Sequence, residues 1–198
     1  MGDIVKIIDE LINKYKKTQN STRGVLTEEC KAIINYIIVT SDMYNSNKSL
    51  KDPKREILDL NKINSILFML QLCYAEKYGK LVFEDEFYAG IYGPTIERIY
   101  YEYNRSYGND FHLSIIPTNS VVSDEVKEIL DCVLEYTRQL TTTKLRDMVQ
   151  QNELWYSVFD PKKKEDCHRN IISNGKILDY CQNYDEHKSN EKRLTKKC

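Results

Sequence analysis

Glycine and proline are scarce in this sequence, with 7 and 4 residues among 198. Collagen-like repeats are therefore excluded, and so few turn residues argue against an all-β sandwich or barrel. Hydrophobic residues make up 41% of the chain and charged residues 30%, which still allows one hydrophobic core. The length suits a single domain with appendages, and the lack of helix breakers favours long helices.

The sequence also lacks an excess of either charge, because 29 basic residues stand against 30 acidic ones. A nucleic-acid binder usually has a pI above about 9, so the chain as a whole has no such footprint. No run approaches the ~18 apolar residues of a membrane span, and the acidic, amphipathic start is unlike a signal peptide. We therefore expect a cytoplasmic protein with no membrane partner, whose six cysteines are reduced thiols.

Recognisable catalytic motifs are missing as well. There is no GxSxG, HExxH, P-loop or GxGxxG pattern, and no two cysteines form CxxC. The three histidines lie far apart in sequence and match no zinc-ligand spacing with the cysteines. We therefore predict no enzyme, no cofactor and no metal site. A metal-dependent hydrolase that uses Glu84, Asp85 and Glu86 is the least favoured alternative, because an exposed, charged hairpin turn explains this cluster more simply.

What is present is helical periodicity. Apolar residues recur at helical spacing in several segments, and each segment follows a residue that can cap a helix. The expected caps are Asp3, Thr27, Asp59, Ser123, Thr141 or Thr142, and Ser173. Gly79 is expected to end the helix that follows Asp59, and Pro94 to occupy the first position of another helix.

Short apolar runs around the acidic cluster predict two short strands or a hairpin. The expected fold class is thus mainly α, a compact multi-helix domain with a small β-hairpin around residues 80–92. We expect an N-terminal helix and linker at 1–26, the main domain at 27–185, and a basic, disordered tail at 186–198.

Tyrosine is unusually frequent, with 15 residues in the chain and six between positions 88 and 107. Tyrosine provides a large contact area at low entropic cost and is enriched at interfaces. Ordinary helix packing is the favoured interpretation for any single tyrosine, whereas for the whole cluster an interaction surface is equally well supported. The single tryptophan, Trp155, is expected to anchor the core or a lid.

The stretch from residue 60 to residue 103 resembles the signature of the Panacea domain of SocA-like antitoxins, also called phage-associated or GepA-like proteins. The residues that carry the resemblance are Leu60, Lys62, Gly79, Phe87, Ala89, Gly93 and Pro94, together with Trp155 further along the chain. The resemblance implies that they either set the fold or contact the partner. The resemblance covers about residues 28–183. The chain has Gln150 where the family usually has a histidine, Thr95 where valine is common, and a longer spacer around 45–58.

This resemblance implies an antitoxin of a toxin–antitoxin pair, on a prophage or mobile element, that binds and neutralises a toxin encoded by the adjacent gene. A second role as a protease adaptor is implied by the namesake of the family. Neutralisation needs an occluding surface with a few aromatic anchors. We place that surface at Tyr88, Tyr92, Tyr100, Tyr101 and Tyr103. The main alternative is a DNA-binding regulator of its own operon that uses the tail at 186–198.

Overall fold

The computed structural model describes residues 25–107, 113–161 and 170–183. The helices within these ranges are α2 (Glu28–Asn45), α3 (Leu60–Tyr78), α4 (Glu97–Tyr107), α5 (Asp124–Arg138), α6 (Thr142–Gln150), α7 (Glu153–Val158) and α8 (Asn174–Gln182). The strands are β1 (Phe87–Gly90), β2 (Gly93–Thr95) and β3 (Ile171–Ile172). The predicted mainly helical fold with a small hairpin is confirmed. The expected helix after Asp3, the tail at 186–198, the three histidines and Cys167 lie outside the described residues.

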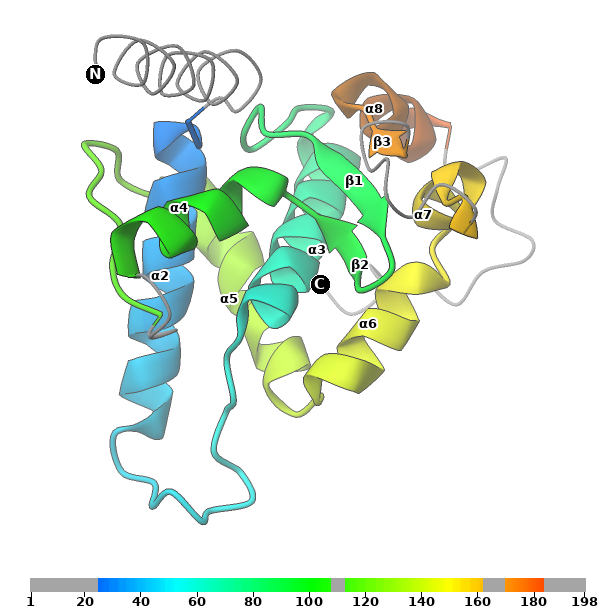
Figure 1. Cartoon of the computed structure of the whole chain (residues 1–198). Helices are drawn as coiled ribbons and strands as arrows, with labels where there is room; N and C mark the ends of the chain where they lie inside the picture. The colour runs from blue at the N-terminus through cyan, green and yellow to red at the C-terminus, as the bar shows by residue number, and fades with distance from the viewer. Residues whose placement is uncertain (1–24, 108–112, 162–169, 184–198) are drawn as a thin grey trace, which may run out of the picture.

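Helix α3 lies at the centre of the fold, in contact with α5, α6, α8 and β2 (Figure 1). Its nineteen residues include fifteen buried ones, on all sides of the helix. A helix that is apolar all round is stable only when neighbours cover every face. The elements that surround α3 are therefore arranged by the need to bury it.

The predicted helix caps within the described residues are confirmed. The side chains of Thr27, Asp59, Ser123, Thr141 and Ser173 each accept a hydrogen bond from the backbone amide three residues later. Gly79 ends α3 in the left-handed conformation, with φ 62°. Such caps satisfy amides that a helix leaves unpaired at its start, so they define where each helix begins.

The three strands form one antiparallel sheet in the order β2-β1-β3. Tyr88 pairs with Thr95 in the hairpin, and Phe87 pairs with Ile172 across the other edge of β1. The expectation of a strand in the apolar run at 81–83 was wrong, because this run is not a strand. Instead, the Gln71 side chain donates to the carbonyl of residue 83 at 3.0 Å and accepts from the amide of residue 82 at 3.0 Å.

The expectation that Pro94 opens a helix was also wrong. Gly93 and Pro94 belong to β2, an edge strand, and α4 begins only at Glu97. Proline is tolerated at a sheet edge because its missing N–H costs no bond in the ladder. The Asn64 side chain then accepts from the amide of Ile96 at 2.7 Å, which fixes the chain where β2 passes into α4.

Candidate partner-binding site

A groove of about 330 Å³ lies beside the hairpin, and we call it the tyrosine groove. It is formed by β1, the hairpin turn, β2, the first turns of α3 and α4, and residues that follow α7 or precede β3. Its lining residues are Asn61, Tyr88, Ala89, Gly90, Ile91, Tyr92, Thr95, Glu97, Tyr100, Phe159 and Asn170. Segments that are far apart in the sequence thus meet at one aromatic hollow.

Of the five tyrosines predicted to bind the partner, Tyr88, Tyr92 and Tyr100 line the tyrosine groove. Tyr92 is 56% exposed at the hairpin turn, and Tyr101 is 36% exposed on α4. Tyr103 lies in the core at 2% exposure, and its hydroxyl donates to the carbonyl oxygen of Ser114 at 3.1 Å. A partner would reach Tyr103 only by displacing α4, so we leave it out of the proposed surface.

Tyr100 has a fixed orientation in the groove. Its hydroxyl donates to the side-chain oxygen of Asn61, on α3, at 2.7 Å. Burial, with smaller contributions from the negative charge of Asp59 and from the neighbouring Tyr92, raises the pKa of Tyr100 to about 12. Tyr100 is therefore a neutral, preoriented aromatic ring at physiological pH, and an anchored ring loses little entropy on binding.

The hairpin turn is held from outside the sheet by residues of α6 and α7. The indole nitrogen of Trp155 donates to the carbonyl of Gly90 at 3.2 Å, and Gln150 donates from Nε2 to the carbonyl of Ile91 at 2.9 Å. The Trp155 ring stacks on Phe159 with centroids 4.2 Å apart. Trp155 is only 6% exposed, so of the two predicted roles it has that of a core anchor. Sequence reasoning missed the contribution of Phe159, although it follows Trp155 at helical spacing.

Apart from Gly79, which is exposed at the end of α3, the remaining motif residues are buried in the fold rather than presented at its surface. Leu60, Phe87 and Ala89 are at most 5% exposed. Lys62 is also buried, and its Nζ lies 3.1 Å from Oε1 of Glu56, a partner that the sequence did not reveal. Of Leu60, Lys62, Phe87 and Ala89, only Ala89 lines the tyrosine groove. The other three therefore affect the groove only through the fold that supports it.

The acidic cluster at 84–86 is not an exposed hairpin turn, which corrects the favoured interpretation. Asp85 is completely buried and accepts from both the amide and the hydroxyl of Thr27 and from Nη1 of Arg98 at 3.0 Å. Its carboxylate thus ties the start of α2 to α4. Within the described ranges, no group of three or more His, Cys, Asp or Glu side chains could hold a metal ion.

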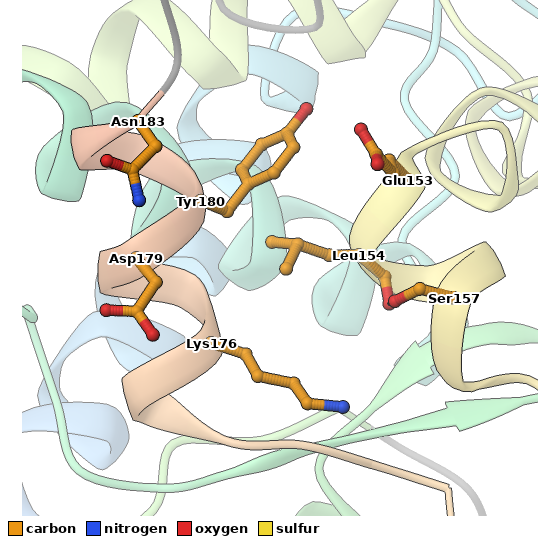
Figure 2. Close-up of a pocket in the computed structure, with 7 residues that line it drawn as sticks. All are labelled: Glu153, Leu154, Ser157, Lys176, Asp179, Tyr180 and Asn183. Atoms are coloured by element: carbon orange, nitrogen blue, oxygen red, sulfur yellow. The ribbon is translucent and has the colours of Figure 1, made fainter. Parts of the chain in front are cut away.

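Two other hollows lie on the described surface. Figure 2 shows the smaller, about 220 Å³, where α7 faces α8, with Lys176 and Asp179 on one side and Glu153 on the other. The larger, about 410 Å³, is lined by charged and polar side chains around Tyr44 and Arg138. Neither contains a residue that the sequence singled out, and neither has the aromatic lining of the tyrosine groove.

Comparison with known families gives one match. Residues 60–156, about half of the chain, match the family model described as "Antitoxin SocA-like, Panacea domain". No curated protein and no solved structure matches the chain. No helix within 25–107, 113–161 or 170–183 is long and apolar enough to cross a membrane.

Proposed function

Because the chain carries a Panacea domain of the SocA-like antitoxin family, we propose that it is an antitoxin that neutralises a cognate toxin by direct binding at the tyrosine groove. The observation that carries the placement is that Tyr88, Tyr92 and Tyr100 line one hollow. Binding energy at interfaces is concentrated in a few aromatic residues that fill desolvated pockets. An antitoxin-like role agrees with the predicted lack of an enzyme activity.

The construction of the groove supports binding without a large rearrangement. The hairpin turn is fixed by the hydrogen bonds from Trp155 and Gln150, and Tyr100 is fixed by Asn61. A surface that is ordered before binding does not lose further conformational entropy in the complex. The toxin would be inactivated because the antitoxin occludes the surface that the toxin uses against its target.

Co-purification with the product of the adjacent gene tests this proposal. We expect Tyr92→Ala and Tyr101→Ala to weaken binding at least tenfold each, because hot-spot aromatics cost about 2 kcal/mol or more on truncation. Tyr101 does not line the groove itself but follows the lining residue Tyr100 on α4. Tyr156→Ala is the matched control, since Tyr156 is 76% exposed on α7, which contributes no lining residue. The variants should also fail to restore growth when the toxin is expressed, whereas the control should restore it.

Wild-type binding by both folded tyrosine variants would refute the placement of the site. Failure of the wild-type protein to bind the adjacent gene product, or to relieve its toxicity, would refute the antitoxin role. Delivery of the bound toxin to a protease and association with a prophage are finer parts of the proposal. The half-life of the toxin with and without the antitoxin tests delivery to a protease. The genes that flank the pair test the association with a prophage.

A further inference from the structure

The tyrosine groove is lined by a buried side-chain amide that has no partner within the described chain. Asn170, the residue before β3, lines the groove and is only 3% exposed. Its backbone carbonyl accepts from the amide of Ala89 at 2.8 Å, whereas its side chain forms no hydrogen bond with another residue that the structure describes. Buried polar groups are nearly always hydrogen-bonded, because a polar group without a partner is unfavourable. The Asn170 amide is therefore suited to bind a group of another molecule.

A second amide at the groove is only partly used. Asn61, in the first turn of α3, lines the groove and accepts at Oδ1 from the Tyr100 hydroxyl at 2.7 Å. Its Nδ2 group donates to no residue in the described ranges. The bond to Tyr100 fixes the orientation of the carboxamide, so Nδ2 is a preoriented donor. The groove thus presents one oriented donor at Asn61, and both a donor and an acceptor at Asn170.

Other parts of the protein show what such an amide binds. Asn35 donates from Nδ2 to the carbonyl of Ile116 at 2.7 Å and accepts from the amide of the same residue at 2.8 Å. Asn45 forms the same pair of bonds with the backbone of Glu56, both at 2.9 Å. Ile116 and Glu56 lie in segments that are neither helix nor strand. Side-chain amides in this protein therefore bind the N–H and C=O groups of chain segments that have no regular pairing.

Charge does not select the partner of the groove. Glu97, the charged side chain among the described lining residues, already has an interaction of its own. Arg146 packs beside Gly93 of the hairpin and is paired with Asp147 at 2.8 Å, so its charge is balanced. Recognition at the groove must therefore depend on hydrogen bonds and on the faces of the aromatic rings.

We propose that the tyrosine groove binds an extended segment of the toxin through the peptide groups of that segment. This inference rests on the proposed antitoxin function. One peptide group would pair with the carboxamide of Asn170, and the carbonyl of another would accept from Nδ2 of Asn61. The side chains of the segment would pack against the rings of Tyr92 and Phe159, which line the same groove.

A helix or an apolar surface of the toxin fits the groove less well. The interior peptide groups of a helix are bonded within the helix, so only its side chains could reach the two amides. An apolar surface would cover the Asn170 amide without offering it a partner, which is unfavourable. An extended segment brings unpaired N–H and C=O groups and a row of side chains to the same site.

The first test measures both toxin affinity and stability for the same variants. Asn170→Leu keeps the size of the side chain but removes its hydrogen-bonding groups. We expect it to weaken toxin binding about tenfold, because a peptide group of the toxin would be buried without a partner. The melting temperature of the free protein should stay equal or rise, since the Asn170 side chain has no bond to another described residue to lose.

Asn61→Asp tests the second amide. Aspartate keeps an acceptor for the Tyr100 hydroxyl and removes the Nδ2 donor, so we expect it to weaken toxin binding about tenfold as well. A negative charge is favourable in the first turn of a helix, so α3 should not lose stability. A thermal melt by circular dichroism measures this.

Asn35→Leu is the matched control. Asn35 has the same carboxamide, but it is bonded within the chain to Ile116 and does not line the groove. We expect this variant to lower the melting temperature and to change toxin affinity by less than about twofold, as for a site outside the interface. The opposite pattern in Asn170→Leu would separate an amide that binds the toxin from one that supports the fold.

The second test determines whether an isolated segment is sufficient. Overlapping peptides of about 12 residues, which are too short to hold a helix in water, cover the adjacent gene product. Binding is followed by the fluorescence of Trp155, the single tryptophan, which stacks on the lining residue Phe159. We expect one peptide, or two that overlap, to bind the wild type and to lose about tenfold in affinity for Asn170→Leu.

The results distinguish this inference from the function on which it rests. Toxin affinity that is equal in wild type, Asn170→Leu and Asn61→Asp would overturn the backbone contacts and leave the antitoxin role standing. Weaker binding by Asn170→Leu together with a lower melting temperature would indicate a structural role and overturn the inference. Tighter binding by Asn61→Asp, or binding of the intact toxin but of no peptide, would also overturn it. No toxin binding by the wild type would overturn both proposals.

Discussion

Replacing Lys62 by methionine should destabilise the protein strongly, because this lysine belongs to an ion pair in the core. Lys62 Nζ lies 3.1 Å from Glu56 Oε1 and donates to the carbonyl of Leu140 at 3.3 Å. Both side chains of the ion pair are 1% exposed. Methionine keeps most of the length of lysine but removes its charge, so Glu56 retains one cation, Arg138, whose Nε is 3.9 Å from Oε2.

The expected cost follows from this burial. Loss of one partner of a buried ion pair costs about 3–5 kcal/mol, because the other charge stays buried, and Arg138 at 3.9 Å compensates Glu56 only in part. In a protein of this size each kcal/mol lowers the melting temperature by about 2–4 °C, so we expect a fall of roughly 6–20 °C. The double variant Lys62→Met/Glu56→Gln removes both charges and should recover most of the loss, since neutral replacement of a buried pair is often harmless.

Urea and thermal unfolding, followed by circular dichroism at the helical band, measure these differences. Lys77→Met is the matched control, because Lys77 and Glu128 form an ion pair at 3.2 Å with side chains 47% and 71% exposed. We expect the control to change stability by less than about 1 kcal/mol. The reasoning is refuted if Lys62→Met costs no more than the control, or if the double variant is no more stable than Lys62→Met alone.

Two further predictions concern stability. Hydrogen bonds from Lys31 and from the amide of Asn119 lower the pKa of Glu28 from 4.5 to about 2, so its stabilising effect is full above pH 4.5 and is lost as pH falls towards 2. Glu28→Gln should therefore flatten the acid side of the stability profile, and an unchanged profile would contradict this. Gly79→Ala should cost about 1 kcal/mol in urea unfolding, because its φ is +62°. Gly175→Ala, in open space within α8, should instead stabilise by about 0.5–1 kcal/mol, and equal effects would contradict the backbone argument.

Helix starts with a polar cap residue were predictable from the sequence because a cap acts over a short range, whereas the start expected at Pro94 was wrong. Thr27 and Asp59 bond to amides only three residues ahead, and Gly79 ends α3 through its own backbone conformation. The information for these features lies within one turn of the chain. Helix α7 escaped prediction, since its six residues are too few to show a periodic pattern.

Strand pairing was less predictable because it depends on distant residues. The pairing of Phe87 with Ile172 joins segments 85 positions apart. The run at 81–83 has the same apolar character as a strand, yet the side chain of Gln71 occupies its backbone groups. No local pattern distinguishes a run whose amides bond to a side chain from one whose amides bond to another strand.

The candidate site was predictable in part. Tyrosine density identified Tyr88, Tyr92 and Tyr100, which the fold brings to one groove. The same density did not separate Tyr103, although its position four residues after the buried Ile99 indicates the inner face of α4. Asn61 and Phe159 complete the groove from other elements; helical spacing pairs Phe159 with Trp155, but only the tertiary structure places either residue at the groove.

The third strand has a practical consequence for the design of truncated fragments. The family match ends at residue 156, whereas β3 pairs with β1 at residues 171 and 172. A fragment cut to residues 60–156 would leave one edge of β1 with bare amides and carbonyls beside the normally buried Phe87. Open strand edges recruit other copies of the same chain. We therefore expect that fragment to self-associate when expressed. The shortest fragment suited to crystallisation should extend from α2 to α8.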